Sequence, residues 1–279
     1  MGKVAIISDI HGNLEALKTV LSDIRKRNVD KIICLGDIVA KGRHFHECIE
    51  LIKDNCDIVL QGNCDLYFSN NEYSEDKVNN ERIQYNRNLL TNDDILFLKE
   101  LPYFYEMKIS GNLVRFFHAT PTLINKFIGD IADLDTYYEM FLPSDNTLSL
   151  DIADIVVYGH IHKSYMMKLF NRTIVNAGSV GNSFEVYRHK DKDASYKNVT
   201  KACYLVLNGN IGSDYGSISY EFVELDYDIE KELSDSKDAY EYDGLVSELK
   251  YGIYRDLEGI RESLASRGLN IDEIEKKYN

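Results

Sequence analysis

The amino-acid sequence predicts an α/β fold with a parallel sheet at its core and a helical region at its C-terminal end. In the first 60 residues, short apolar runs alternate with helical patterns, as in a series of strand–helix–strand units. Strand patterns return between residues 103 and 225, and the remaining residues are acidic with a helical apolar stripe. The chain has 279 residues, of which 44% are hydrophobic and 28% charged. It is therefore the size of one large domain or two small ones, and its composition is globular.

The first part of the chain contains three predicted strands and two predicted helices. A buried strand is expected at Val4–Ile7, followed by an amphipathic helix over 14–27 whose apolar residues recur at three- and four-residue steps. A second strand (Lys31–Leu35), a short helix (His46–Lys53) and a third strand (Asp57–Leu60) follow. Right-handed crossovers between these strands make the sheet parallel, and functional loops then lie beyond the carboxyl ends of the strands.

The middle of the chain is expected to form a hairpin between two less regular segments. Strands Tyr103–Ile109 and Leu113–His118 flank a Ser-Gly-Asn sequence whose residue types favour a tight turn. Residues 66–100 are polar and helical in pattern, and residues 119–150 are expected to form loop and helix over one face. Five further strands are predicted, at Ile155–Tyr158, Tyr165–Phe170, Thr173–Asn176, Cys203–Leu207 and Ser217–Leu225.

The C-terminal region differs in charge and pattern from the rest of the chain. Residues 226–279 hold 15 acidic and 8 basic residues, which is half of the net charge of −14. An apolar stripe predicts one helix over 246–264 that Gly268 ends, and Asn270 with Glu273 resembles a capping box for a last helix. We predict a catalytic domain over 1–230 and an acidic helical extension over 231–279 that packs on it, either as a solvated helix or as a dimerisation surface or lid.

Charge and cysteine content limit the partners that this chain can have. A net charge of −14 and a pI near 5.0 leave no basic surface for a nucleic-acid polymer, although small phosphorylated substrates remain open. No apolar stretch approaches the ~20 residues of a membrane span, and no secretory pattern precedes the first strand. Five sparse cysteines without C-x-x-C spacing favour a reducing compartment. We expect a cytoplasmic protein that binds neither nucleic-acid polymers nor membranes, and a homo-oligomer remains open.

Polar residues of metal-ligand type follow many of the predicted strands. Taken singly, an Asp or Asn at such a position usually caps a turn, and a histidine is more often a hydrogen-bonded structural residue. Here, however, four of the seven histidines lie at strand ends, where an open α/β sheet builds its site. Five such positions in one register favour a metal site rather than a set of unrelated turns. They are Asp9-x-His11, Gly36-Asp37, Gly62-Asn63, His118 and Gly159-His160-Ile161-His162.

In order and spacing, these residues resemble the calcineurin-like metallophosphoesterases, from about Val4 to Leu225. The family motifs are D-x-H, G-D, G-N-C-D, an isolated histidine and G-H-x-H. The Cys64 variant of the third of these and the N-x-G-S-V-G segment at 176–181 are similar to the small prokaryotic phosphoesterase branch. The resemblance implies a two-sheet sandwich flanked by helices, with 66–100 and 119–150 as cap-like segments over the site.

The resemblance also implies a dinuclear metal site. Manganese or iron is the family's usual answer, and zinc or nickel remains open, because oxygen and imidazole ligands suit all of these metals. A hydroxide that bridges the two ions would attack phosphorus in line, with no phospho-enzyme. The ligands carried over are Asp9, His11 and His162 for the first ion, Asn63, His118 and His160 for the second, and Asp37 as the bridge.

Two residues depart from the family pattern. Most relatives have a histidine at the position of Cys64 that protonates the leaving oxygen, so this thiol is either a weak general acid or a small buried hydrophobe. Arg43 follows the Asp37 motif without the usual G-D-x-x-D-R-G spacing, and it is either a phosphate ligand or a solvated loop charge. The predicted catalytic residues are Asp37, Asn63, Cys64 and Arg43, with Asn63 and Arg43 also expected to bind substrate.

These features together predict a dinuclear metal-dependent phosphohydrolase. The favoured substrates are small phosphomonoesters or nucleotides, including dinucleoside polyphosphates such as diadenosine tetraphosphate. The alternatives are a phosphodiesterase on cyclic nucleotides or small diesters, a protein phosphatase, and a metal-free scaffold with the same fold. Because all seven proposed ligands precede the C-terminal extension, deletion of residues 243–279 is expected to leave a metal-binding core.

Overall fold

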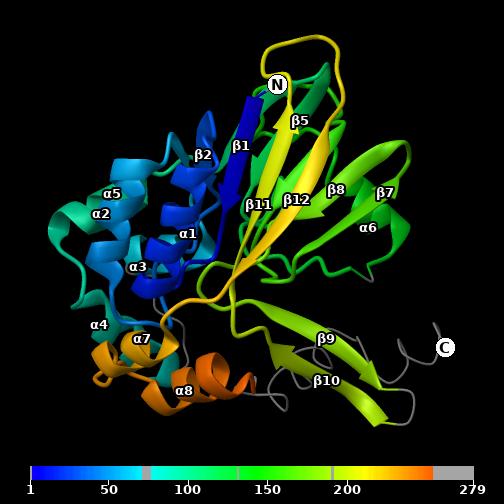
Figure 1. The fold of residues 1–279 in the computed structure, drawn as a ribbon. Coiled ribbons are helices and arrows are strands. Elements are labelled where there is room, and N and C mark those ends of the chain that lie inside the picture. The colour runs from blue at the N-terminus through cyan, green and yellow to red at the C-terminus, as the bar shows by residue number, and fades with distance from the viewer. Residues whose placement is uncertain (1, 71–76, 131, 190–191, 254–279) are drawn as a thin grey trace.

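Two five-stranded sheets lie face to face at the centre of the structure (Figure 1), a computed structural model that describes residues 2–70, 77–130, 132–189 and 192–253. The first sheet has the strand order β12-β11-β1-β2-β3 and the second has the order β4-β5-β6-β8-β7. Buried side chains from both sheets, such as Ile6 and Leu205 of the first and Phe116 and Val157 of the second, form one hydrophobic cluster between them. The predicted two-sheet sandwich flanked by helices is therefore confirmed.

The first sheet is parallel where the sequence predicted it to be. Strands β1, β2 and β3 run parallel, and β11 pairs antiparallel with β1. In β1, Val4 and Ile6 face the second sheet, whereas Ala5 and Ile7 face the helices on the other side, so this strand is buried on both faces. The bounds are β1 Gly2–Ile7, β2 Lys31–Cys34, β3 Ile58–Val59, β11 Ala202–Gly209 and β12 Ser219–Leu225.

The second sheet is mixed. Its three inner strands β5, β6 and β8 are parallel, and β4 and β7 pair antiparallel at its two edges. The turn between β4 and β5 is the predicted Ser-Gly-Asn hairpin, in which Gly111 has a φ of +80°. The bounds are β4 Phe104–Ile109, β5 Asn112–Phe117, β6 Ile155–Tyr158, β7 Tyr165–Leu169 and β8 Arg172–Asn176.

Helices cover the outer faces of both sheets. Helix α1 (Leu14–Lys26) begins where the Asn13 side chain accepts a hydrogen bond from the Ala16 amide, and with α2 (Phe45–Asn55) it covers the first sheet (Figure 1). The segment after residue 66 adds to the same layer through Phe68, Ile83 and Leu98. The segment 119–150 packs on the second sheet and includes α6. The remaining bounds are α3 Asn63–Asn70, α4 Lys77–Arg87, α5 Asn92–Glu100 and α6 Leu134–Glu139.

One hairpin has no counterpart among the predicted elements. Strands β9 (Phe184–His189) and β10 (Lys192–Asn198) pair antiparallel and extend away from both sheets (Figure 1). Their sequence is rich in charged residues and has no continuous apolar run. These two strands join neither of the large sheets, so they have no sheet core to face and lack the apolar runs by which the other strands were predicted.

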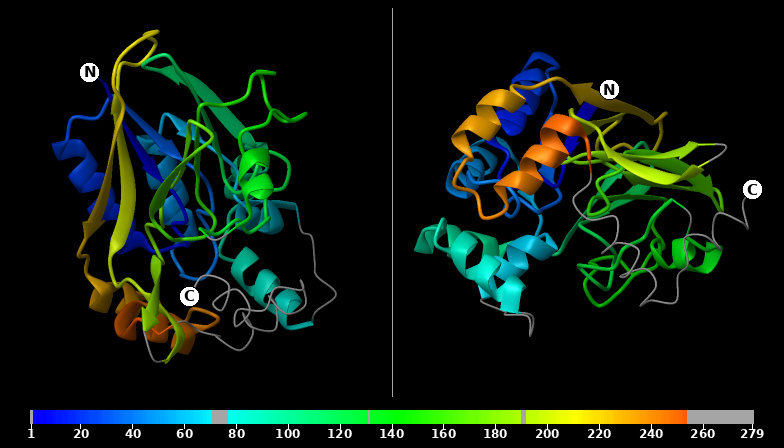
Figure 2. Two further views of the ribbon diagram at one scale, coloured as in Figure 1. Left: turned by 90° about the vertical axis from the view of Figure 1, so that its right-hand side faces the viewer. Right: turned by 90° about the horizontal axis from the view of Figure 1, so that it is seen from below.

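The C-terminal extension begins with two helices that lie against the rest of the chain (Figure 2). Helix α7 (Ile229–Asp235) packs against α1 and against α8 (Tyr242–Tyr251). The prediction of one helix over 246–264 is wrong, because α8 ends at Tyr251 and is capped by Gly252, which has a left-handed φ of +66°. The remainder of that apolar stripe, Gly268 and the predicted capping box lie outside the described residues.

The extension contains a buried carboxylate that makes stability depend on pH. Glu232 is fully buried and accepts hydrogen bonds from the Glu15 amide at 3.1 Å and from Ser236 Oγ at 3.0 Å. Burial raises the pKa of Glu232 more than the Glu15 amide and His44 lower it. The folded chain therefore favours the protonated acid, and the ionised form costs stability as pH rises above the ordinary glutamate range.

Glu232→Gln should remove that cost while keeping a polar side chain for both partners. The melting temperature of this variant is expected to exceed that of the wild type at pH 8, with the difference shrinking toward pH 4. Glu230→Gln serves as the control, because Glu230 is an exposed carboxylate that pairs with Lys250. The difference in melting temperature between this variant and the wild type should not grow from pH 4 to pH 8. A pH-independent difference between Glu232→Gln and wild type would contradict the assignment.

Candidate metal centre

The seven predicted metal ligands converge at one end of the sandwich. The His160 amide joins the loops of the two sheets, since it donates to Asp9 Oδ2 at 3.0 Å. Within the first sheet, the His11 amide donates to the Asp37 carbonyl at 3.0 Å. Ligand atoms of Asp9, His11 and His162 lie within 4.8 Å of one another, and so do those of Asp37, His118 and His160. Asn63 joins the second group, with its Oδ1 3.0 Å from His118 Nε2.

Most of these residues have an unusual backbone conformation. Five of the seven have positive φ angles, 54° at Asp9, 52° at His11, 52° at Asp37, 67° at His160 and 58° at His162. For residues with a Cβ this region costs about 1 kcal/mol or more each, and such strain clusters at functional sites. The strained loops turn the side chains that follow the strands toward a common point.

Two glycines in the predicted motifs are needed for close approach. A Cβ at Gly62 would overlap Asp37 Oδ1, and a Cβ at Gly159 would overlap Ser8 Oγ. Both glycines directly precede a predicted ligand. The motifs G-N and G-H-x-H therefore have a steric reason for their first residue, independent of the chemistry of the site.

The first group of donor atoms is arranged for a cation. His11 Nδ1 lies 3.1 Å from the Val39 carbonyl and His162 Nδ1 lies 2.7 Å from the Asn182 carbonyl. Because a carbonyl only accepts, each Nδ1 carries a proton, and in the neutral rings the lone pairs of the two Nε2 atoms then face each other at 2.9 Å. Asp9 Oδ1 is buried beside them without a hydrogen bond. Three electron-rich atoms directed at one point fit a bound divalent cation.

The second group shares the Asp37 carboxylate with the first. His118 Nδ1 donates to the Leu35 carbonyl at 3.0 Å, so its Nε2 is the ring nitrogen that faces Asn63 and Asp37. Asp37 Oδ2 lies 3.5 Å from His118 Nε2 and 3.9 Å from His11 Nε2, while Asp37 Oδ1 accepts the Cys64 amide at 2.8 Å. One carboxylate oxygen thus faces both groups, which is the position that a bridging ligand requires.

The pKa values of the site follow from burial and from this mutual contact. Burial raises the pKa of Asp9, but His162 outweighs it and lowers the pKa to about 2. Burial likewise opposes ionisation of Asp37, but His118 and His11 hold the pKa of this carboxyl well below its usual range. Burial and His162 lower the pKa of His11 to about 3. The carboxylates of Asp9 and Asp37 are therefore ionised and His11 is neutral at neutral pH, as metal ligands must be. At His118, Asp37 outweighs burial and raises the pKa to about 9, so a cation bound there would have to displace the ring proton.

Cys64 lies beside the site, and Arg43 does not. The Cys64 thiol is within 4.8 Å of the ligand atoms of His11 and Asp37, and its Sγ accepts from Asn63 Nδ2 at 3.5 Å. Arg43 instead forms an ion pair with Asp238 of the extension, in a separate depression of about 340 Å³.

Other residues hold the ligand loops without being predicted as site residues. Asp65 is fully buried and accepts the amides of Asp37 at 2.8 Å, Ile38 at 2.9 Å and Gly62 at 2.9 Å. Ser179 Oγ donates to the Asp9 carbonyl at 2.7 Å. The sequence signal for both was present, since Asp65 ends the G-N-C-D motif and Ser179 lies in the N-x-G-S-V-G segment.

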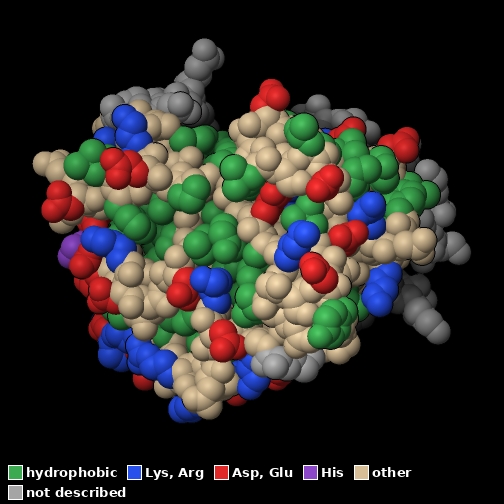
Figure 3. Space-filling model, turned by 90° about the horizontal axis from the view of Figure 1, so that it is seen from above, with side chains coloured by type: hydrophobic (Ala, Val, Ile, Leu, Met, Phe, Trp, Pro, Cys, Tyr) green, Lys and Arg blue, Asp and Glu red, His purple; other side chains and the backbone are tan. Residues whose placement is uncertain are grey.

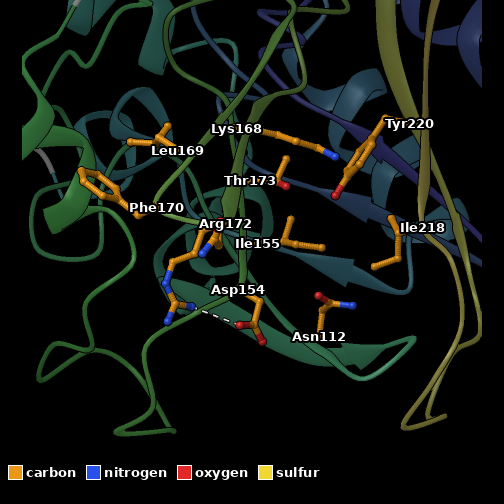
Figure 4. A pocket seen from close by; sticks show the side chains of 11 residues that line it. Asn112, Asp154, Ile155, Lys168, Leu169, Phe170, Arg172, Thr173, Ile218 and Tyr220 are labelled. Atoms are coloured by element: carbon orange, nitrogen blue, oxygen red, sulfur yellow. Dashed lines mark hydrogen bonds and ion pairs between the residues drawn. The ribbon is translucent and has the colours of Figure 1, made fainter.

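A cavity of about 590 Å³ lies at the opposite end of the sandwich, near the first residues of β5, β6 and β8. Hydrophobic side chains gather in the middle of this end (Figure 3), and Lys168 and Tyr220 point into the cavity (Figure 4). Its Arg172 is already paired with Asp154 at 3.1 Å. Among the described residues, no histidine or cysteine lines the cavity, so its chemistry differs from that of the metal centre.

Comparison with known proteins identifies the family. The family model of the calcineurin-like phosphoesterase superfamily domain matches residues 3–196. The chain therefore belongs to the calcineurin-like phosphoesterase superfamily, as its motifs predicted, and it is a metal-dependent phosphoesterase. No helix in the described part of the chain is both long enough and apolar enough to cross a membrane.

Individual proteins are similar to this chain in sequence or in fold. The chain is 30% identical over 242 residues to the uncharacterized protein MJ0912 of Methanocaldococcus jannaschii, covering 82% of this chain and 89% of the relative. Its fold is similar to that of a metallophosphoesterase from Sphaerobacter thermophilus, with a TM-score of 0.65, 23% identity, and coverage of 90% of this chain and 99% of that one. The hypothetical protein PH1004 of Pyrococcus horikoshii gives a TM-score of 0.67 at 17% identity, covering 91% and 98%.

Proposed function

We propose that this protein is a dinuclear metal-dependent phosphohydrolase that acts on small phosphomonoesters or nucleotides, including dinucleoside polyphosphates. The observation that carries the proposal is the position of Asp37, whose Oδ2 faces His11 at 3.9 Å and His118 at 3.5 Å. A carboxylate shared between two sets of imidazole and oxygen donors suits a pair of divalent cations.

Each of the two groups of neighbouring donor atoms would hold one ion. Asp9, His11 and His162 would hold one ion, and Asn63, His118 and His160 the other, with Asp37 shared. Oxygen and imidazole donors suit manganese, iron, zinc and nickel, and the resemblance to the family favours manganese or iron among them. When bound, such ions polarise phosphoryl oxygens and lower the pKa of an attacking water.

The chain's own residues would then orient the substrate and control the leaving group. The Asn63 side chain, half-buried at the start of α3, can contact a phosphoryl oxygen as well as an ion. The Cys64 thiol lies close enough to the same centre to face the departing oxygen, and it is a weak hydrogen-bond donor. This favours substrates whose leaving groups need little protonation, such as anhydrides and aryl phosphates.

The charge of the chain supports small substrates over polymers. The net charge of −14 repels long polyanions, whereas two divalent cations against the carboxylates of Asp9 and Asp37 leave the centre itself positive. All five cysteines are free thiols, which supports the proposal of a reducing, cytoplasmic location.

A phosphate-release screen under defined metal loading tests the proposal. The purified chain, stripped and reloaded with Mn²⁺, Fe²⁺, Zn²⁺ or Ni²⁺, is assayed on nucleotides, dinucleoside polyphosphates, cyclic nucleotides, aryl mono- and diesters and phosphopeptides. We expect the highest kcat/KM on nucleotides or dinucleoside polyphosphates with Mn²⁺ or Fe²⁺. Comparable turnover of a bis-aryl diester would favour a phosphodiesterase, and preferential turnover of phosphopeptides would favour a protein phosphatase. Absence of turnover with every metal would refute a phosphohydrolase.

A further inference from the structure

The C-terminal extension places a buried carboxylate close to the metal centre. Glu248 of α8 is only 1% exposed. Its Oε2 accepts a hydrogen bond from Asn182 Nδ2 and lies 3.5 Å from Lys41 Nζ. A carboxylate removed from water is costly unless it is paired and hydrogen-bonded, so these contacts determine where Glu248 can lie.

Asn182 connects this carboxylate to a proposed metal ligand. The Asn182 carbonyl is the group that accepts the Nδ1–H of His162 at 2.7 Å, and its own amide donates to Ser179 Oγ at 2.8 Å. The Asn182 side chain is held at both ends, since Nδ2 donates to Glu248 and Oδ1 accepts from Asn198 Nδ2. Glu248 therefore helps to fix the carbonyl that sets the ring orientation and tautomer of His162.

The second contact of Glu248 reaches the loop beside the other histidine of the same donor group. Lys41 has a left-handed φ of 61°. The next residue, Gly42, donates its amide to the His11 carbonyl at 2.9 Å. One carboxylate of the extension thus contacts the supports of both His162 and His11.

The geometry points to a role for the extension in the metal centre: we propose that Glu248 is a positioning residue for the ion held by Asp9, His11 and His162. The inference rests on the proposed dinuclear function. It also refines the expectation that deletion of residues 243–279 leaves a metal-binding core, because that core would lack Glu248 and would hold this ion more weakly. Partners that orient a metal-ligating histidine typically contribute about 10–100-fold to metal affinity.

The experiment measures Mn²⁺ binding by calorimetry on the full-length, metal-stripped chain. Glu248→Ala is expected to weaken one of two binding events about 10–100-fold and to leave the other unchanged. His162→Asn identifies the affected event, because loss of this ligand should abolish it. Glu230→Ala removes an exposed carboxylate of the same extension and should bind both ions like the wild type.

A reciprocal exchange distinguishes positioning from a general loss of stability. Asn182→Asp should weaken the same event, since two carboxylates then face each other. The double variant Asn182→Asp with Glu248→Gln restores a hydrogen bond with donor and acceptor exchanged, so affinity should recover at least tenfold relative to Asn182→Asp alone. This comparison remains informative if Glu248→Ala fails to fold.

Two results would overturn the inference. One is wild-type affinity for both ions in a folded Glu248→Ala. The other is equal weakening of both events with no recovery in the double variant, which would assign Glu248 a structural role only. A wild-type chain that binds no Mn²⁺ would instead refute the dinuclear function itself, so the two failures are distinguishable.

Discussion

Asp37→Asn is expected to lower kcat by about 10³-fold or more and to leave the fold intact. The Asp37 Oδ2 atom faces both donor groups, so loss of its charge weakens the hold on both ions. Metal ions contribute several kcal/mol of transition-state stabilisation, and about 4 kcal/mol corresponds to roughly 10³-fold in rate. Asparagine keeps an oxygen that can accept the Cys64 amide, which Asp37 Oδ1 accepts at 2.8 Å, so the loop should keep its conformation.

The measurement is kcat on an aryl phosphate together with the metal content of the same sample. Asp93→Asn, an exposed carboxylate in the first turn of α5, is the control and should retain wild-type activity and metal content. The melting temperature of the metal-stripped Asp37→Asn chain should be close to that of the stripped wild type. Full activity with two bound ions in Asp37→Asn would exclude Asp37 as the shared ligand.

Cys64→His is expected to raise the turnover of alkyl phosphates selectively. The thiol lies beside His11 and Asp37 but is a weak hydrogen-bond donor with an ordinary pKa of about 8.5, so an alkoxide leaving group receives little help from it. A well-placed general acid contributes about 10²–10⁴-fold, and an imidazole at this position can supply part of that. Aryl phosphates leave as stabler anions and should change little.

The ratio of kcat/KM on an alkyl and an aryl phosphate, under full metal loading, measures this effect. Cys64→His should raise the ratio by about tenfold or more, whereas Cys64→Ser should leave aryl turnover within a few-fold of the wild type. A collapse of aryl turnover in Cys64→Ser would show that the thiol is itself a ligand or an essential acid.

The sequence was sufficient to predict the two sheets and the convergence of the metal ligands, because both depend on local sequence patterns. Short apolar runs marked every strand of the two sheets, and a parallel strand presents its carboxyl end to the edge where its neighbours end. Asp9 and Asp37 could therefore be placed together although the chain between them forms a helix and a strand. The same reasoning placed His118 and His160 together, because they follow the neighbouring parallel strands β5 and β6 of the second sheet.

The features that the sequence did not predict depend on contacts between distant segments. Glu248 and Asn182 are 66 residues apart, and Arg43 meets Asp238 across 195 residues. No periodicity connects such pairs, so the role of the extension beside the site appears only in the fold. The end of α8 could have been predicted from the sequence. Gly252 is a residue type that often ends helices, but the regular spacing of the apolar residues on both sides of it favoured one continuous helix.

The number of ions needed for turnover tests the dinuclear centre most directly. The metal-stripped chain is titrated with Mn²⁺ while bound metal, by mass spectrometry, and phosphate release from a nucleotide are followed in the same samples. With the seven residues Asp9, His11, Asp37, Asn63, His118, His160 and His162 as ligands, binding should saturate at two ions per chain, and activity should rise only as the second ion binds. Full activity at one ion per chain, or activity in the stripped chain, would contradict a dinuclear mechanism.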